Sequence, residues 1–311
     1  MKKIVFAVVM ITITCFIIFG VYYIMRDDKN NSNNDFNIIT NEYESKLSSL
    51  KYSKEEISDI IKLFSEEDIK NYLSDKKYDN LLEYKKVSIF NIANIDRYDN
   101  YDKLNDYSSD KVVIYVEIGL DKEFYTDINE VNPNIDKLVL VNKYNKLPDN
   151  YEASDLITLD SKYSSNGQKV KNEIYINLVN MFNDAKENGL SMKVVSGYRT
   201  HKLQNTLFTN STKRNGLEHA LLYSAKPGHS EHQTGYAIDI NTVQDSFANT
   251  KEYEYLINNS YKYGFIERYP KGKEYITGYG YEPWHYRYVG IEAANIIHEK
   301  NITFEEYKVL Y

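Results

Sequence analysis

The longest hydrophobic stretch lies at the start of the chain, where Ile4 to Ile24 contains no charged residue. Its 21 residues, at about 1.5 Å of helix rise each, match a bilayer core of about 30 Å. Lys2 and Lys3 precede the stretch and the charges at 26–29 cancel, so the positive-inside rule predicts a cytoplasmic N-terminus. We therefore expect residues 1–27 to form an N-terminal membrane anchor, with the rest of the chain outside the membrane.

A cleaved signal peptide is the alternative interpretation of this stretch. Signal peptides have a shorter apolar core and small residues at the cleavage site. Here the stretch is long and ends in Gly20-Val21-Tyr22-Tyr23, which is a poor cleavage site. The pattern therefore favours an uncleaved, single-pass anchor in the cell membrane.

The pattern of residues 28–110 is typical of a tether followed by a helical spacer. Residues 30–37 are rich in Asn and low in complexity, which predicts a flexible tether. Between residues 52 and 84, apolar positions recur at helical spacing behind Ser53 and Ser65, and acidic residues follow each serine as at a helix start. Residues 96–110 are rich in Asp, Asn and Tyr, and predict a loop or a domain boundary.

A denser hydrophobic pattern begins at Lys111 and predicts an α+β domain over residues 111–311. Strands are predicted where β-branched residues cluster, and helices where apolar residues recur every three or four positions. The predicted strands are 112–118, 138–141, 193–196, 237–240 and 284–289, and the predicted helices are 172–188, 203–208, 251–263 and 292–299. Since strands and helices do not alternate regularly, we expect a small, mainly antiparallel sheet with packed helices.

The charge of the chain argues against one class of function, and its cysteine content excludes two kinds of structural cross-link. The formal net charge is −7 and the chain has no long run of Lys or Arg, which argues against nucleic-acid binding. Cys15 is the only cysteine, so the chain forms no intramolecular disulfide and no cysteine-based structural metal site.

Two segments near the C-terminus carry the candidate chemistry. The first runs from Ser230 to Asp239 and contains His232, and the second, Glu282-Pro283-Trp284-His285, ends in a histidine. Two histidines and an aspartate are enough to hold a catalytic zinc ion and leave one coordination position open. On the predicted strand 237–240, Asp239 points away from the isoleucines. A glycine at 235 permits a turn that brings the first histidine to the same metal.

Two further residues fit a hydrolytic site around that metal. Glu282 lies three residues before His285, and Pro283 stiffens the link between them, so this glutamate is a candidate base for activating water. Arg199 follows a predicted strand and a glycine, and spacing alone leaves it either in the site or in an exposed turn.

These segments resemble a known family of metallopeptidases. Residues 230–239 match the pattern Ser-x-His-x-x-Gly-x-Ala-x-Asp of the D-alanyl-D-alanine carboxypeptidases and dipeptidases. Residues 282–285 match their second motif, and Ser196-Gly197-Tyr198-Arg199 matches their arginine segment. The resemblance covers about residues 111–311, and it is to zinc D,D-carboxypeptidases of the vancomycin-resistance type and related L,D-carboxypeptidases.

The resemblance implies a fold of the D-Ala-D-Ala peptidase and hedgehog type, and a role for each matching residue. The implied zinc ligands are His232, Asp239 and His285. Glu282 is the implied catalytic base, and Arg199 the residue that stabilises the oxyanion. The implied contacts with substrate come from Ser230, Gln204 and Tyr269.

The sequence thus predicts a membrane-anchored zinc carboxypeptidase that removes the C-terminal D-alanine from peptidoglycan stem peptides or their precursors. An L,D-carboxypeptidase that trims tetrapeptide stems to tripeptides is an alternative with the same catalytic residues. A zinc-holding, non-catalytic wall-binding module is a second alternative, which the presence of both Glu282 and Arg199 disfavours.

Overall fold

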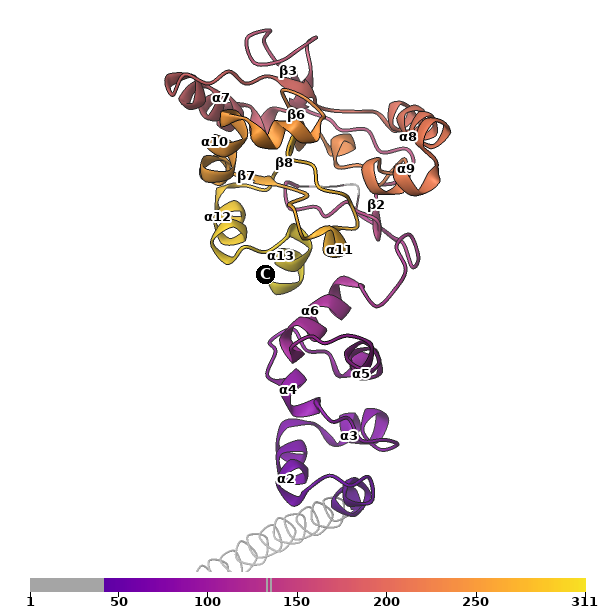
Figure 1. Ribbon diagram of the computed structural model, residues 1–311. Coiled ribbons are helices and arrows are strands. Elements are labelled where there is room, and N and C mark those ends of the chain that lie inside the picture. Colours follow the sequence, from indigo (N-terminus) through magenta and orange to yellow (C-terminus); the bar gives the residue numbers. More distant parts are fainter. Residues whose placement is uncertain (1–41, 133, 135) are drawn as a thin grey trace, which may run out of the picture. The chain divides into compact units, whose positions relative to one another are not determined.

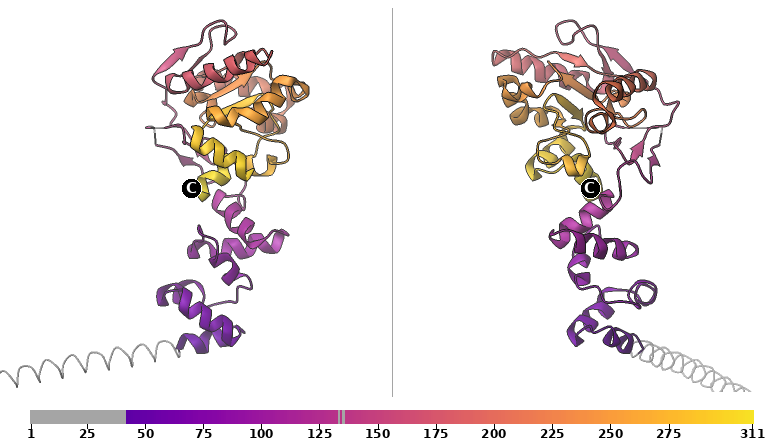
Figure 2. Two further views of the ribbon diagram at one scale, coloured as in Figure 1. Left: turned by 90° about the vertical axis from the view of Figure 1, so that its left-hand side faces the viewer. Right: turned by 45° about the vertical axis from the view of Figure 1, so that its right-hand side comes forward.

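The computed structural model describes residues 42–132, 134 and 136–311, and Figures 1 and 2 show the ribbon. The chain divides between Asp110 and Lys111 into two compact units. The predicted membrane anchor, residues 1–27, lies outside the described residues. Among the residues that are described, no helix has the length and apolar character needed to cross a membrane.

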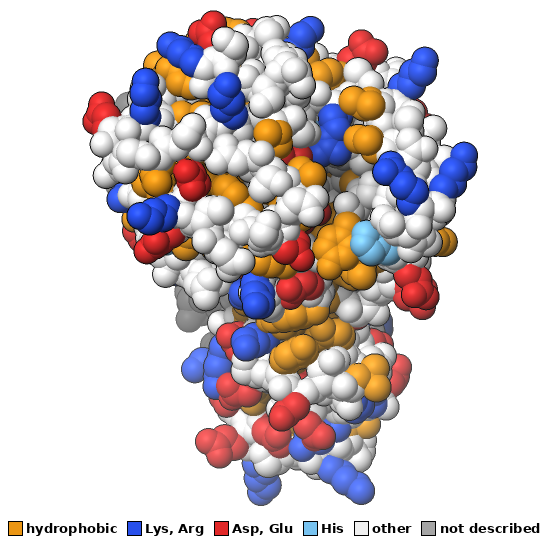
Figure 3. All heavy atoms as spheres, turned by 45° about the horizontal axis from the view of Figure 1, so that its top comes forward, with side chains coloured by type: hydrophobic (Ala, Val, Ile, Leu, Met, Phe, Trp, Pro, Cys, Tyr) orange, Lys and Arg blue, Asp and Glu red, His pale blue; other side chains and the backbone are white. Residues whose placement is uncertain are grey.

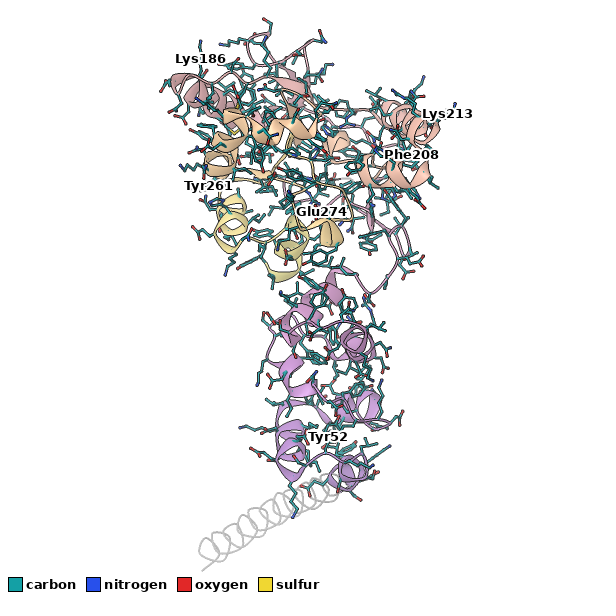
Figure 4. The ribbon with its side chains drawn as sticks, viewed as in Figure 1. Tyr52, Lys186, Phe208, Lys213, Tyr261 and Glu274 are labelled. Atoms are coloured by element: carbon teal, nitrogen blue, oxygen red, sulfur yellow. The ribbon has the colours of Figure 1, made fainter. Side chains whose placement is uncertain are left out.

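The first unit is helical. It contains α2 (Lys54–Leu63), α3 (Glu66–Tyr72), α4 (Leu81–Lys85), the short 3-10 helix η1 (Ile92–Asn94) and α5 (Ile95–Leu104). Ser53 and Ser65 begin α2 and α3 with reciprocal capping boxes, which confirms the two helix starts predicted from sequence. Tyr52, labelled in Figure 4, is buried, and its hydroxyl accepts a 2.8 Å hydrogen bond from the backbone N–H of Tyr78.

Residues 96–110 were predicted to form a loop or a domain boundary. The loop is wrong, because α5 occupies most of this stretch, whereas the chain does divide into its two units at the end of it. Ile95, Tyr98 and Asp99 are buried at helical spacing, and Asp99 accepts a 2.7 Å hydrogen bond from Lys103 one turn later. The helix could not be predicted from its hydrophobic pattern, because only one of its buried positions, Ile95, is aliphatic; the others are a tyrosine and an aspartate.

The second unit contains short strands and longer helices. Its helices are α6 (Ser109–Ile118), which begins at the boundary, α7 (Asn172–Glu187), α8 (His201–Asn215), α9 (Leu217–Tyr223), α10 (Lys251–Asn259), α11 (Glu274–Thr277), α12 (Ile291–Lys300) and α13 (Phe304–Leu310). Its 3-10 helices are η2 (Glu231–Thr234), η3 (Asp245–Asn249) and η4 (Ser260–Tyr263). Its strands are β1 (Asn129–Glu130), β2 (Asn145–Lys146), β3 (Leu156–Thr158), β4 (Lys169–Lys171), β5 (Val194–Ser196), β6 (Ala237–Ile240), β7 (Phe265–Glu267) and β8 (His285–Tyr288).

Two predicted strands of this unit are wrong. Residues 112–118 belong to helix α6, which buries Val112, Val113 and Val116. A short run of β-branched residues cannot be distinguished from a buried helix by periodicity alone. Residues 138–141 form no strand; the carbonyl of Val139 accepts a 2.9 Å hydrogen bond from the Arg287 guanidinium instead of from a neighbouring strand.

The central sheet confirms the α+β class and the small antiparallel sheet. Its strand order is β5-β6-β8-β7, and each neighbouring pair is antiparallel. The register pairs Asp239 with His285 and Ile238 with Tyr286. Because side chains alternate along each strand, Asp239 and His285 share one face while Ile238 and Tyr286 share the other.

The apolar face of the sheet packs against α7 and α10. Ile238, Ile240 and Phe265 from the sheet join Leu178 of α7 and Leu256 of α10 in one buried cluster. Figures 1 and 2 show α7 and α10 on one side of the sheet and the neighbouring helices α8 and α9 on the other. The apolar residues thus anchor the sheet, and its second face is left for polar side chains.

The surface carries charges of both signs. On the face drawn in Figure 3, Lys and Arg side chains are interspersed with Asp and Glu rather than gathered in one area.

Glu267 provides a pH test of this packing. Its side chain is half-buried on β7 and accepts a 2.9 Å hydrogen bond from the Tyr253 hydroxyl. Burial outweighs this bond and raises the pKa of Glu267 from 4.5 to about 7. The folded protein therefore keeps the proton up to a higher pH than the unfolded chain does. The resulting stability is complete below pH 4.5 and is lost as the pH rises through 7.

We expect Glu267→Gln to be more stable than the wild type at pH 8, by on the order of 2–3 kcal/mol. This advantage should vanish near pH 4, because the wild-type side chain is then protonated in both the folded and the unfolded chain. Thermal unfolding at both pH values measures the difference, with exposed Glu254→Gln as the control. A pH-independent difference between Glu267→Gln and the wild type would contradict the assignment.

Candidate metal centre

Asp239 and His285 meet because their strands pair in register. Asp239 on β6 lies directly opposite His285 on β8, and the Oδ1 of Asp239 is 3.0 Å from the Nδ1 of His285. Both side chains are about 3% exposed. The sheet therefore fixes two of the three predicted ligands beside each other.

His232 reaches the same point from η2, the 3-10 helix that precedes β6. Gly235 ends η2 in the left-handed conformation, with φ of 79°, and turns the chain into the strand. The Nε2 of His232 lies 3.3 Å from Asp239 Oδ1 and 3.2 Å from His285 Nδ1. The predicted turn at Gly235 thus brings all three side chains together, with ligand atoms within 4.8 Å of one another.

Hydrogen bonding decides which nitrogen of His232 can bind a metal. The Nδ1 of His232 lies 2.8 Å from the carbonyl oxygen of Gly197. A carbonyl only accepts, so Nδ1 carries the proton and Nε2 has a lone pair. That lone pair points at the carboxylate of Asp239, which also only accepts. Lone pairs that face one another in a buried site repel, and a cation between them would remove this repulsion.

The three residues fit zinc. Two imidazoles and one carboxylate are a ligand set found for catalytic zinc, which keeps a fourth position open. Ligands about 2.0–2.2 Å from a tetrahedral ion lie roughly 3.3 Å from one another. The observed separations of 3.0, 3.2 and 3.3 Å match that spacing.

The electrostatics of the cluster also favour a positive ion. Burial, reinforced by the nearby Arg199 guanidinium, lowers the pKa of His232 to about 4, so this ligand is neutral at pH 7. For His285, burial lowers the pKa, but the neighbouring carboxylates of Asp239 and Glu231 outweigh burial and raise the pKa to about 9. The carboxylates around His285 thus stabilise positive charge, which either a proton or a metal ion supplies.

Glu282 lies at the edge of this cluster. Its Oε2 is 3.9 Å from the Nδ1 of His285, and the backbone carbonyl of Glu282 accepts a 3.1 Å hydrogen bond from the His285 N–H across the Pro283 turn. Burial, with a further contribution from Asp239, raises the pKa of Glu282 to about 8. A carboxyl group beside the metal position with a pKa near neutrality is suited to accept and return a proton.

Arg199 lies in the site, which resolves the choice that spacing left open. Its backbone N–H donates to the carbonyl of His232 at 3.1 Å. The guanidinium places Nη2 3.4 Å from Asp239 Oδ2, and Nη1 donates to Gln204 Oε1 at 3.0 Å. The positive charge is therefore held beside the metal cluster, where negative charge on a reacting oxygen would be stabilised.

One pocket of about 710 Å³ contains every site residue predicted from sequence. The predicted residues that line it are Arg199, Gln204, Ser230, His232, Asp239, Tyr269, Glu282 and His285. Gln204 uses both ends of its amide inside the protein, because Nε2 also donates to the Ala225 carbonyl at 2.8 Å. Tyr269 stacks on the His285 ring with centroids 4.9 Å apart.

Other parts of the pocket were missed by the sequence analysis. Leu207 on α8, Tyr223 on α9 and residues 243–245 also line it. Glu231 also lines the pocket, fully buried between Ser230 and His232. Its place inside the first segment was a signal that it lies near the metal. Its buried arginine partners are distant in sequence, and spacing could not reveal them.

The chain matches known carboxypeptidases in sequence. Residues 167–291 match the family described as VanY: D-alanyl-D-alanine carboxypeptidase. The putative carboxypeptidase YodJ of Bacillus subtilis (strain 168) is 43% identical over 209 residues, which cover 61% of this chain and 76% of that protein.

Two solved structures are also similar. The LdcB LD-carboxypeptidase, solved to explain peptidoglycan recognition, is 40% identical, with a TM-score of 0.56 over 61% of this chain and 92% of that one. A vancomycin resistance D,D-pentapeptidase VanY in complex with Zn(II) is 39% identical, with a TM-score of 0.49 over 55% of this chain and 98% of that one.

The cluster predicts one divalent metal ion per chain. We expect His232→Ala to lose most of the bound metal, because two ligands hold an ion much more weakly than three. Glu282→Gln should retain it, since this side chain lies beside the cluster and outside the ligand set. Elemental analysis of the purified proteins measures both. Equal metal loss in the two variants would show that the ligand assignment is wrong.

Proposed function

The chain belongs to the VanY D-alanyl-D-alanine carboxypeptidase family, and from this membership and the pocket we propose that it is a zinc carboxypeptidase acting on peptidoglycan stem peptides. It removes the C-terminal D-alanine from stems that end in D-alanyl-D-alanine. The observation that carries the proposal is the convergence of Glu282 and Arg199 on the His232–Asp239–His285 cluster within one pocket. A protein that merely held a metal would need neither the base nor the arginine.

The proposed mechanism gives a task to each residue around the scissile bond. Zinc, when held by the cluster, polarises the scissile carbonyl and lowers the pKa of water. Glu282 takes a proton from the attacking water and returns one to the leaving amine. Arg199 offsets the negative charge that develops on the carbonyl oxygen, an effect that is typically worth a few kcal/mol.

The pocket favours a free C-terminus over an internal bond. Ser230 and Gln204 line the pocket, and Gln204 contacts Arg199, so both can contact a terminal carboxylate. The pocket, of about 710 Å³, is larger than the space that two alanine residues fill. The pocket thus suits the end of a longer stem.

An L,D-carboxypeptidase is the second candidate. The specific observation in its favour is the 40% identity to the LdcB LD-carboxypeptidase, with a TM-score of 0.56. The family description supports the D,D activity. Both activities use the same cluster, base and arginine, and they differ in which C-terminal residue pair the pocket accepts.

Muropeptide digestion separates the two activities. Incubation of the zinc-loaded protein with pentapeptide and tetrapeptide stems, followed by mass spectrometry, should show loss of one alanine from the pentapeptide. The tetrapeptide should stay intact. Glu282→Gln is the matched control, and it should lower turnover by roughly 10²–10⁴-fold while keeping its metal. Conversion of tetrapeptide to tripeptide with pentapeptide untouched would establish the L,D activity instead.

We further propose that residues 1–27 hold the protein at the outer face of the cytoplasmic membrane. The support is the uncharged run from Ile4 to Ile24 behind two lysines. The full-length protein should fractionate with membranes, and protease added outside should digest the second unit. Recovery in the medium of a mature form that begins near Arg26 would show that the segment is cleaved.

A further inference from the structure

Four charged side chains lie completely buried beneath the metal cluster. Glu231, Arg268, Arg287 and Glu305 are each at most 1% exposed. They come from η2, the end of β7, β8 and α13 respectively. Burial of a charged side chain is costly unless the charge is paired, so loss of one partner in this cluster would leave another buried charge unpaired.

Within this ionic cluster, one carboxylate oxygen of Glu231 contacts the arginines and the other faces the metal ligand His285. Glu231 Oε1 accepts from Arg268 Nε at 2.8 Å and lies 3.1 Å from Arg287 Nη1. The other oxygen, Oε2, is 3.6 Å from His285 Nε2. Within the described part of the chain, neither Oε2 nor this Nε2 has a hydrogen-bond partner.

The ligand role of His285 determines where its proton must be. Its Nδ1 faces Asp239 and His232, so Nδ1 must offer a lone pair to a metal ion. A neutral imidazole that does so carries its proton on Nε2. Glu231 Oε2 is the carboxylate oxygen that this N–H faces.

We propose that Glu231 is a positioning residue that holds His285 in its metal-binding orientation and tautomer. Its carboxylate accepts the Nε2–H of His285 when the metal is bound, as the Gly197 carbonyl accepts the Nδ1–H of His232. Carboxylates that accept from metal-bound histidines fix the ring and the tautomer in this way. The proposal takes from the proposed function only the identity of the metal.

The position of Glu231 is itself set from α13. Arg268 donates to both carboxylate oxygens of Glu305, at 2.9 and 2.6 Å. Asn142 also donates to Glu305, at 3.2 Å. Arg287 is held by the carbonyls of Lys137 and Val139, at 2.9 Å each. The two arginines therefore cannot move toward solvent, and they keep Glu231 under His285.

The first test compares two isosteric substitutions in the same ionic cluster. Zinc affinity of the full chain is measured by competition with a chromophoric chelator. We expect Glu231→Gln to bind zinc about 10–100-fold more weakly. Glu305→Gln removes the same charge but does not touch His285, and its amide oxygen can still accept from Arg268, so it should lower the melting temperature and weaken zinc binding much less than Glu231→Gln does. Wild-type zinc affinity in Glu231→Gln, or an equal loss in both variants, would overturn the proposal.

The second test uses the wild type, so it does not depend on either variant folding. Nitrogen-15 NMR of the zinc-loaded protein labelled at histidine reports which ring nitrogen is protonated. We expect one metal-bound histidine protonated at Nδ1 and the other at Nε2, with the second proton protected from exchange. Two metal-bound histidines that are both protonated at Nδ1 would refute the proposal. Neither test uses a peptide substrate, so each outcome is independent of the peptidase assay.

Discussion

The pairing of β6 with β8 is the constraint on which the metal site depends. It sets Asp239 opposite His285, and the same register sends Ile238 and Tyr286 into the core on the other face. A slip of one residue would bury the two ligands among apolar side chains and turn the isoleucines outward. The hydrophobic effect that fixes the sheet therefore also fixes the spacing of Asp239 and His285.

The metal-binding face of the sheet can be buried because its carboxylates are paired with positively charged or hydrogen-bonding side chains. Asp239 is neighboured by Arg199 and by two histidines, and the carboxylates of Glu231 and Glu305 are matched by two arginines below them. Pairing on this scale does not add much net stability, because desolvation offsets most of the attraction. Its effect is specificity of position, since Glu231 and Glu305 are each held by an arginine from another segment of the chain.

Much of the second unit could be predicted from sequence, and the failures have a common physical origin. The helix at α7 and the strands at β5 and β6 follow from local patterns that also serve the tertiary structure. Ser230, Gln204 and Tyr269 were predicted only from the family resemblance, and all three line the pocket. The strands expected at 112–118 and 138–141 failed because neighbours distant in sequence decide those conformations, as the contact of Val139 with Arg287 shows. The ionic cluster around Glu231 could not be predicted for the same reason, since 37 positions separate Glu231 from Arg268.

The helices α8 and α9 are anchored differently from the rest of the pocket. Among the described residues of α8 only Gln204 is buried, and in α9 only Ala220. Leu203, Leu207, Leu222 and Tyr223 are all exposed. Substitutions at exposed positions change folding free energy little, usually by within about 0.5 kcal/mol. The exposed positions of α8 and α9 can therefore change, and with them the substrate that the pocket accepts, while the metal ligands and the core of the sheet stay the same.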